Sequence, residues 1–294
     1  MKEEINKGIK YMLFASFLFA LMGAVAKELS SSMSSVEVSF FRNVFGVFII
    51  LFALYKKPPK QTGGKPWLLF FRGFAGFVSL LMFFYMISVV PLGEAMTFSK
   101  TSTIFTAVLA YVFLKEKLGI KGWIGVFIGF IGIVFITKFE GTYLDKNSIL
   151  GVLCGFGAAL AYTSVRELRK YYDSRVIVLS FMAIGTIGPA ILLLIGNYYT
   201  NPNLDFMIAT FTMPKNSDWI YIVLLGIFAT QAQIYMTKSY SYAKAGIIGT
   251  ISYSNIVFSI VIGLIMGDSF PEIMVILGIM FIIISGLLVS SKKE

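Results

Sequence analysis

The sequence predicts an all-α membrane protein with ten transmembrane helices, arranged as two inverted five-helix repeats. Three observations predict this fold. The chain is 57% hydrophobic and only 14% charged, with a mean hydropathy of +0.82, whereas soluble domains are roughly half apolar and a quarter charged. Apolar stretches long enough to cross a bilayer recur from end to end. Basic residues concentrate in alternate loops.

The predicted spans follow from the length of these apolar stretches. A helix needs about 20 residues to cross a hydrocarbon core of about 30 Å, and short polar joints bearing glycine or proline separate the stretches. The ten spans are 8–28, 36–55, 67–89, 92–114, 121–138, 148–166, 175–197, 217–237, 244–266 and 271–289. The longest connection, 198–216, is polar and is predicted to be a loop. A cleaved signal peptide is the alternative for the first span, although this stretch is long enough to cross the membrane.

The loop charges predict the topology. The loops after the even-numbered spans, together with both termini, hold most of the lysines and arginines, and we count Arg72 among them. The opposite loops hold only Lys27, Lys138, Lys146 and Lys215. This asymmetry places both termini in the cytoplasm and the chain in the cytoplasmic (inner) membrane. The net charge of +10 is therefore a topology signal, and no nucleic-acid partner is expected.

The two halves of the chain resemble each other, which predicts repeats over residues 1–147 and 148–294. Gly8 and Ala15 match Gly151 and Ala158, and Tyr85-Met86 matches Tyr235-Met236. Because each repeat has an odd number of spans, the second begins on the opposite side of the membrane. Inverted repeats around a midplane site are a recurring design of secondary transporters.

A resemblance to a known family follows from the segment 94–117, EAMTFSKTSTIFTAVLAYVFLKEK, and from the glycines of GWIG at 122–125 and GFIG at 129–132. With Arg42 near the start of the second span, the chain resembles the drug/metabolite transporter superfamily and its EamA-type repeat. The resemblance implies a central cavity enclosed by the third, fourth, eighth and ninth helices. Members move amino acids, nucleotide sugars, organic acids, vitamins and drugs, so the resemblance leaves the substrate open.

Lys100 is the most informative candidate residue. It lies about eight residues from the end of its span, near the middle of the bilayer, where an unpaired lysine costs about 2.5 to 3.5 kcal/mol. We predict that Lys100 meets the carboxylate or another anionic group of the substrate. The alternatives are that it snorkels to the surface or pairs with Glu94 or Glu37.

Other polar residues inside the spans are predicted to bind substrate as well. They share the cavity-enclosing helices or lie within spans instead of at their ends: Ser99, Thr103, Tyr85, Tyr162, Gln233, Tyr253 and Asn255. The alternative is that they form interhelical hydrogen bonds or pack. Arg42 and Glu94 are candidates for gating or coupling. For Arg42 the alternatives are an ion pair with Glu37, a periplasmic gate, or an anchor at the membrane interface. For Glu94 they are stabilisation of a helix start or transport of a coupled proton.

The predicted function is that of a secondary transporter for a small metabolite, an amino acid or an organic acid, which works by alternating access. A lipid or lipid-linked sugar flippase on the same scaffold is the alternative, and an integral-membrane enzyme is disfavoured because carboxylates are scattered and histidine is absent. No Walker motif occurs, and no cofactor, metal or catalytic residue is expected. Cys154 is alone, so no internal disulfide forms. The expected partners are a small molecule, the lipid bilayer and a coupled proton, with monomer and homodimer both left open.

Overall fold

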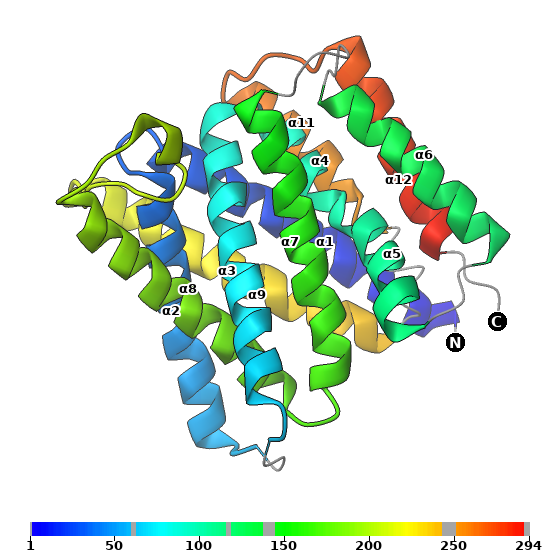
Figure 1. Ribbon diagram of the computed structural model, residues 1–294, viewed down its shortest axis with the longest axis horizontal. Helices are drawn as coiled ribbons and strands as arrows, with labels where there is room; N and C mark the ends of the chain where they lie inside the picture. Colours follow the sequence, from blue (N-terminus) through cyan, green and yellow to red (C-terminus); the bar gives the residue numbers. More distant parts are fainter. Residues whose placement is uncertain (1, 60–62, 116–118, 138–144, 243–250, 291–294) are drawn as a thin grey trace.

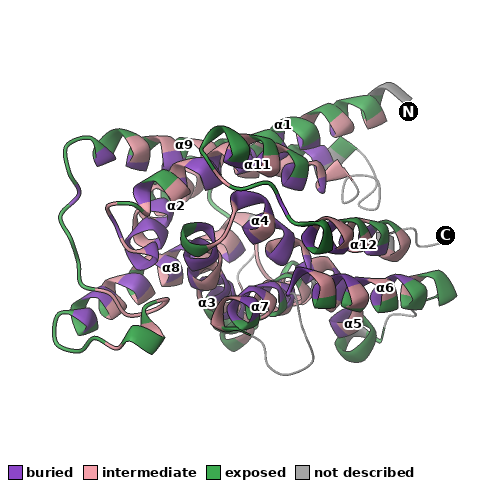
Figure 2. Ribbon diagram, turned by 90° about the horizontal axis from the view of Figure 1, so that it is seen from above, coloured by how far each residue is buried: buried purple, intermediate pink, exposed green. Residues whose placement is uncertain are grey.

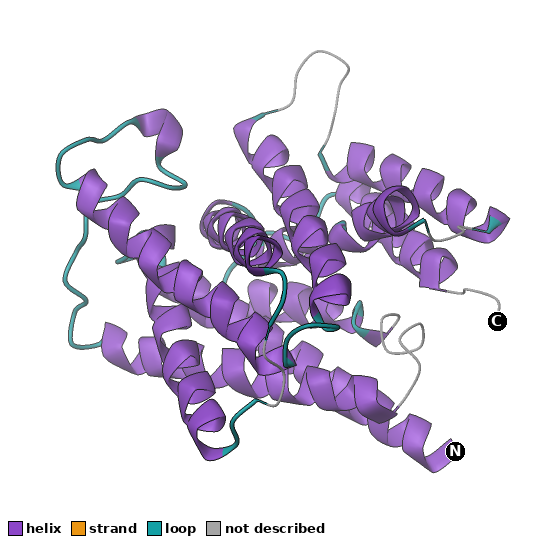
Figure 3. Ribbon diagram, turned by 60° about the horizontal axis from the view of Figure 1, so that its bottom comes forward, coloured by secondary structure: helices purple, strands orange, loops and turns teal. Residues whose placement is uncertain are grey.

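A computed structural model describes residues 2–59, 63–115, 119–137, 145–242 and 251–290, which contain helices and loops but no strand (Figure 3). The helices of these residues are α1 (Lys2–Leu29), α2 (Ser35–Lys56), α3 (Pro66–Val89), α4 (Leu92–Lys100), α5 (Ser102–Leu114), α6 (Ile120–Ile136), α7 (Lys146–Leu168), α8 (Ser174–Gly196), α9 (Asp218–Tyr242), α11 (Ser254–Ile265) and α12 (Ile273–Ser290), with a short 3-10 helix at Pro202–Leu204. By length and composition, α1, α2, α3, α7, α8 and α9 can each cross a membrane.

The predicted spans agree with the helices to within a few residues. The first three spans, the fifth to the eighth and the tenth each correspond to one helix. The fourth span, 92–114, is instead two helices, α4 and α5. Of the ninth span, residues 244–250 lie outside the described residues, and α11 covers most of the remainder. The fold is therefore all-helical over the described residues, as predicted.

Local sequence signals explain where α2 begins. Ser34 is its N-cap, and its hydroxyl accepts a hydrogen bond from the backbone N–H of Glu37. The Glu37 carboxylate accepts the Ser34 backbone N–H in return, at 2.8 Å. This reciprocal capping box satisfies two donors that the helix itself leaves unpaired. The arrangement fixes the start of the helix that carries Arg42.

The helices of the two halves pack in reciprocal pairs (Figure 1). α1 packs against α9 while α3 packs against α7, and α1 packs against α11 while α5 packs against α7. α2 contacts α8, and α6 contacts α12. If α1 is exchanged with α7, α3 with α9 and α5 with α11, the first pairs are converted into one another. Exchanging α2 with α8 and α6 with α12 leaves the last two pairs unchanged.

The helix of the fourth span is interrupted at Thr101. The backbone N–H of Thr101 bonds to the carbonyl of Phe98 at 3.1 Å, and its hydroxyl donates to the same carbonyl at 2.6 Å. A hydrogen bond to the residue three positions earlier is typical of a 3-10 turn, which is tighter than an α-helical turn. A Cβ at Gly155 would overlap Thr101 Oγ1 and lie 3.0 Å from the Phe98 carbonyl oxygen. Gly155 thus lets α7 pack directly on the interruption.

Many large apolar residues of the helices are exposed. Exposed residues lie on the outer sides of the bundle and buried residues on the sides that face other helices (Figure 2). Phe48, Phe52, Phe127 and Leu194 are examples of these exposed side chains. In water such surfaces would be costly, but hydrocarbon is their natural solvent. The distribution fits a multi-pass membrane protein.

Polar contacts tie the helices together at the end of the bundle where α1 ends and α4 begins, which we call the latch end. Lys27 forms an ion pair with Asp268 and donates to the Val90 carbonyl at 3.2 Å. The Asp268 carboxylate also accepts the Leu92 backbone N–H at 2.8 Å. A single carboxylate therefore joins the end of α1, the start of α4 and the turn after α11.

The connection between α8 and α9 also contacts the latch end. The Thr212 backbone N–H donates to Glu37 at 2.7 Å. Asp205 pairs with Lys146 and accepts a hydrogen bond from the Tyr85 hydroxyl at 3.3 Å. This connection is a loop, as predicted, and it is bound to α2, α3 and α7.

At the opposite end, Lys65 and Glu167 join the start of α3 to the end of α7. Their ion pair spans 2.9 Å, and Lys170 contacts the same carboxylate at 2.6 Å. Glu167 lies beyond the apolar span of α7, which ends at Val165. The hydrogen bonds from Lys170 and Lys65 lower the pKa of the Glu167 carboxyl to about 2.

Candidate functional site

A cavity of about 240 Å³ lies between the helices of both halves. Its volume is just below the range of about 300 to 1,000 Å³ that is typical of pockets for drug-sized ligands, so it suits a smaller molecule. The lining residues described by the structure come from α1, α2, α3, α4, α7, α8, α9 and α11: Phe19, Met22, Arg42, Arg72, Gly76, Ser79, Leu80, Phe83, Met96, Ser99, Lys100, Cys154, Ala158, Ala161, Tyr162, Val178, Phe181, Met182, Gln233, Met236 and Asn255.

Three cationic side chains line this cavity, namely Arg42, Arg72 and Lys100, and its described lining residues include no aspartate or glutamate. Arg42 and Arg72 are each only 8% exposed. Charges removed from water are costly unless a group of opposite charge approaches them. The cavity is therefore strongly electropositive and complementary to an anion.

The two arginines share one aromatic ring. Their guanidinium carbons lie 5.6 Å (Arg42) and 4.7 Å (Arg72) from the centroid of Phe181, a distance at which cation–π attraction operates. Arg42 Nη1 donates to Asn43 Oδ1 at 2.8 Å, and Asn43 Nδ2 donates to the Gly185 carbonyl at 3.0 Å. Asn43 thus holds Arg42 against α8.

Lys100 is the last residue of α4, directly before the interruption at Thr101. It lines the cavity and forms no ion pair with any acid that the structure describes. Glu37, one of its two predicted counter-ions, is occupied by the cap of α2 and by Thr212. Glu94 lies in the first turn of α4, as predicted, and is not a lining residue.

The cavity brings together six of the ten predicted site residues: Lys100, Ser99, Tyr162, Gln233, Asn255 and Arg42. Arg42 is buried in the cavity wall, and the hydrogen bonds of the Glu37 carboxylate go to Ser34 and Thr212 and not to Arg42. Asn255 also has a structural role, since its Nδ2 donates to the Ser16 carbonyl at 2.9 Å and joins α11 to α1.

Four predicted site residues lie elsewhere. Tyr85 is near the end of α3, where it contacts Asp205 and the Phe206 ring of the α8–α9 loop. Tyr253 is 4% exposed and packs so tightly on Gly286 of α12 that a Cβ there would overlap its hydroxyl. Thr103 lies in α5, after the interruption at Thr101, whereas Ser99 lies in α4. The two residues therefore do not share the one face of a continuous helix that the sequence predicts. Glu94, the fourth, occupies the first turn of α4 and is not part of the cavity wall.

Arg72 is a functional candidate that the sequence analysis does not identify. It follows a basic loop in the sequence, so it is counted there as one of the loop charges. It lies six residues inside α3, or about 9 Å from the helix start. A charged residue at that depth in an apolar helix is itself a signal of function. Phe181, which both arginines contact, carries no such signal because phenylalanine is common throughout the chain.

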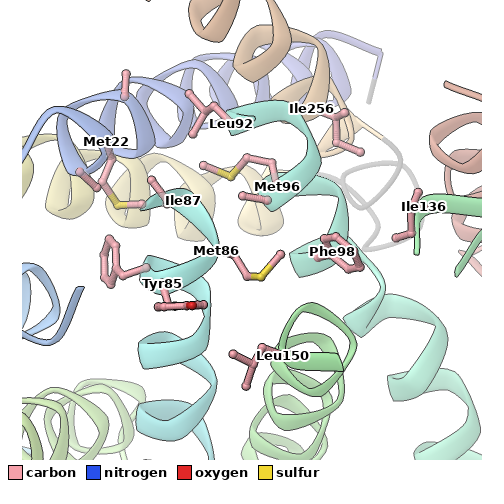
Figure 4. Packing of buried hydrophobic residues seen from close by; sticks show 14 of the residues in the cluster. Met22, Tyr85, Met86, Ile87, Leu92, Met96, Phe98, Ile136, Leu150 and Ile256 are labelled. Carbon is pink, nitrogen blue, oxygen red and sulfur yellow. The ribbon is translucent and has the colours of Figure 1, made fainter. Parts of the chain in front are cut away.

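Buried apolar side chains cover the cavity toward the latch end, and one lining residue of α7 is exposed. Met22, Ile87, Leu92 and Met96 pack together between α1, α3 and α4 (Figure 4), and all four are buried. Tyr162 lines the cavity near the end of α7 and is still 57% exposed. Among the described lining residues, Tyr162 of α7 is the only exposed one, so the cavity wall is least covered there.

The sequence of this chain is similar to those of known transporters. The model of the EamA-like transporter family matches residues 6–138 and again residues 146–291. An uncharacterized transporter of Helicobacter pylori is 33% identical over 99% of this chain and 96% of its own length. The pseudopaline exporter CntI of Pseudomonas aeruginosa is 25% identical over 99% of both chains. The S-adenosylmethionine uptake transporter of Rickettsia bellii is 23% identical over 97% of this chain and 96% of its own.

The fold is also similar to that of a protein with a solved crystal structure. The TM-score is 0.60 at 15% identity, and the match covers 98% of this chain and 96% of that one. Apolar helices around a buried polar cavity define a multi-pass membrane transporter. The chain belongs to the EamA-like transporter family, and its relatives are transporters of the drug/metabolite type. The names of the family and relatives point to transport and not to an enzyme.

Proposed function

We propose that this protein is a secondary transporter that carries a small organic anion of the carboxylate class across the cytoplasmic membrane. The observation that carries the proposal is Lys100, a lysine inside the bundle that lines the central cavity without a carboxylate partner among the described residues. The substrate would supply the missing negative charge. Charge-assisted hydrogen bonds of this kind are about twice as strong as neutral ones.

Alternating access is the proposed mechanism. Residues from both halves line the cavity, and the helix pairs exchange with one another when the halves are interchanged. This reciprocity, together with the two matches to the family model, supports two inverted repeats of five spans, over residues 1–147 and 148–294. Rocking of one half against the other would then cover the side at Tyr162 and open the latch end.

The loop charges support an orientation with both termini in the cytoplasm. In that orientation the exposed Tyr162 lies on the cytoplasmic side of the cavity, and the latch end faces outward. Two of the relatives are named as an exporter and as an uptake transporter, so family membership is compatible with either direction. Direction is therefore a matter for transport assays on membranes of known orientation.

Uptake of radiolabelled carboxylates into proteoliposomes that contain the purified protein tests the proposal. Lys100→Gln is expected to lower transport at low substrate concentration by about 10- to 100-fold, the equivalent of one lost charge-assisted hydrogen bond. Lys10→Gln removes the same charge from an exposed site near the start of α1 and is expected to transport normally. Equal activity of Lys100→Gln and wild type across the carboxylate panel would contradict the proposal.

A further inference from the structure

We propose that Arg42 and Arg72 form a second anion subsite next to Phe181, separate from Lys100, and that the substrate is a dianion such as a small dicarboxylate. This inference rests on the proposed transport function and specifies its substrate class. The side chains that line the cavity must compensate the charge of the substrate, and they therefore indicate its class.

Unpaired guanidinium donors point to an anion at this place. Arg72 Nε and Nη1 and Arg42 Nε are buried and have no hydrogen-bond partner among the described residues. Buried polar atoms in folded proteins are nearly always paired, so three unpaired donors at one site indicate an absent acceptor. The planar guanidinium matches a carboxylate with two parallel hydrogen bonds.

Neighbouring residues hold the arginines of the subsite in place. Arg42 is held by Asn43, which is itself bonded to the carbonyls of Ser39 and Gly185. A Cβ on Gly76 would lie 2.8 Å from Arg72 Nη1 and 2.8 Å from the Phe181 ring. The glycine therefore leaves the space that the guanidinium occupies. Preorganised groups bind more tightly because less ordering accompanies binding.

The cationic groups come from separate parts of the fold. Arg42 and Arg72 belong to α2 and α3 and meet at Phe181 of α8, whereas Lys100 ends α4. All three line one cavity. A molecule that fills the cavity can therefore place one anionic group at the arginines and another at the lysine.

Charge balance favours two negative charges on the ligand. Three cations line the cavity with no acid among the described lining residues. A monocarboxylate would leave two positive charges uncompensated, and a dianion would leave one. The ammonium of a zwitterionic amino acid would enter a cationic site where no described lining residue offers a carboxylate to receive it. Of the amino acid and organic acid classes that the sequence predicts, the cavity thus favours organic acids.

The test compares ligands that differ by one carboxylate. Binding of succinate, glutarate, butyrate and alanine to purified protein would be measured by isothermal titration calorimetry, and uptake of the same compounds in proteoliposomes. We expect a dicarboxylate to bind at least about tenfold more tightly than butyrate, and alanine more weakly than either. The tenfold figure corresponds to one additional charge-assisted contact.

Variants of Arg72 test whether the second carboxylate of the ligand binds at the arginines. Arg72→Gln is expected to weaken dicarboxylate binding by about 10- to 100-fold and to leave butyrate binding within about twofold. Arg72→Lys, which keeps the charge without the planar fork, should give an intermediate loss. Arg42→Gln provides a second route to the same result if Arg72→Gln is poorly folded. Arg169→Gln removes an exposed arginine from the end of α7 and is the matched control.

Two results would overturn the inference: equal affinity of wild type for butyrate and the dicarboxylates, or equal losses for both ligand types in Arg72→Gln. Failure of the proposed function gives a different pattern. If butyrate is transported as well as the dicarboxylates and Lys100→Gln abolishes its transport, the transporter proposal stands while the second subsite is wrong. If no carboxylate is bound or transported by wild type, both are wrong.

Discussion

Arg42 Nη1 donates a 2.8 Å hydrogen bond to Oδ1 of Asn43, the next residue in α2. The neutral amide orients the guanidinium without neutralising its charge. This choice of residue matters, because an aspartate would have nearly the same shape but would supply the negative charge that we assign to the substrate. The pair therefore offers a sensitive probe of the cavity.

Asn43→Asp is expected to lower dicarboxylate affinity by about tenfold, because the new carboxylate pairs with Arg42 and competes with the ligand. Isothermal titration calorimetry with succinate measures the effect. Asn197→Asp adds the same charge at the exposed end of α8 and should bind as wild type does. Unchanged affinity in Asn43→Asp would show that Arg42 does not contact the ligand.

Cysteine labelling can report which side of the cavity is open. In a Cys154→Ser background, Tyr162→Cys is expected to react with a membrane-impermeant thiol reagent mainly from the face on which α7 ends, because residue 162 is exposed near that end. Labelling of right-side-out and inside-out vesicles measures the difference. Reaction mainly from the opposite face would contradict the described closure.

Asp268→Asn is expected to move that labelling toward the opposite face. The change weakens the contact with Lys27, so the end of α1 separates more readily from α4. One charge-assisted hydrogen bond corresponds to a shift of about tenfold in the equilibrium between the two states. Glu28→Gln alters an exposed carboxylate at the same end and should leave the labelling pattern unchanged.

The pair of Lys65 and Glu167 predicts a pH dependence. Because hydrogen bonds from Lys170 and Lys65 lower the pKa of the Glu167 carboxyl from 4.5 to about 2, they stabilise the folded protein above about pH 4.5. That stabilisation is lost as the pH falls toward 2. The melting temperature of wild type should therefore exceed that of Glu167→Gln at pH 7 and at pH 5, with the difference shrinking at pH 3. The difference is expected to be small because solvent screens these exposed groups.

The same pH series on Glu28→Gln provides the comparison, since Glu28 forms no ion pair with the residues that the structure describes. Its melting temperature should stay close to that of wild type throughout. A constant difference between wild type and Glu167→Gln from pH 7 to pH 3 would contradict the assignment.

Gly155→Ala is expected to destabilise the protein by about 1 to 3 kcal/mol, the usual effect of overpacking. Its Cβ would overlap Thr101 Oγ1 and lie 3.0 Å from a backbone carbonyl, which cannot rotate away. Gly119→Ala is the control, because a Cβ there meets nothing within 4 Å. Thermal unfolding in detergent measures both, and equal stability would show that α7 can move away from the interruption.

The helices could be predicted closely because bilayer thickness dictates their length. The interruption at Thr101 could not, since its flanking residues Lys100 and Ser102 are neither glycine nor proline, and serine and threonine side chains oppose a continuous helix only weakly. It arises where α7 packs against the helix at Gly155. This is a tertiary contact that a single span does not reveal.

The candidate site was only partly predictable for a related reason. Tyr85 and Tyr162 both lie within spans, but only the rotation of each helix decides which one faces the cavity. That rotation is fixed by packing, with Tyr85 drawn to Asp205 and Tyr162 directed to the cavity. Lys100 was predictable because a lysine deep inside a membrane span is costly and rarely persists without a functional role. The same reasoning applies to Arg72, whose depth in α3 outweighs its proximity to a basic loop.

The uncompensated positive charge of the cavity has a consequence for energy coupling. A cavity with three cations and one bound dianion differs by two charges from the same cavity when empty, so the loaded and unloaded carriers respond differently to the membrane voltage. Each elementary charge moved through 100 mV corresponds to about 2.3 kcal/mol. A cell with a negative interior thus favours outward movement of the dianion, and uptake becomes independent of that voltage when two monovalent cations are co-transported or another dianion is exchanged.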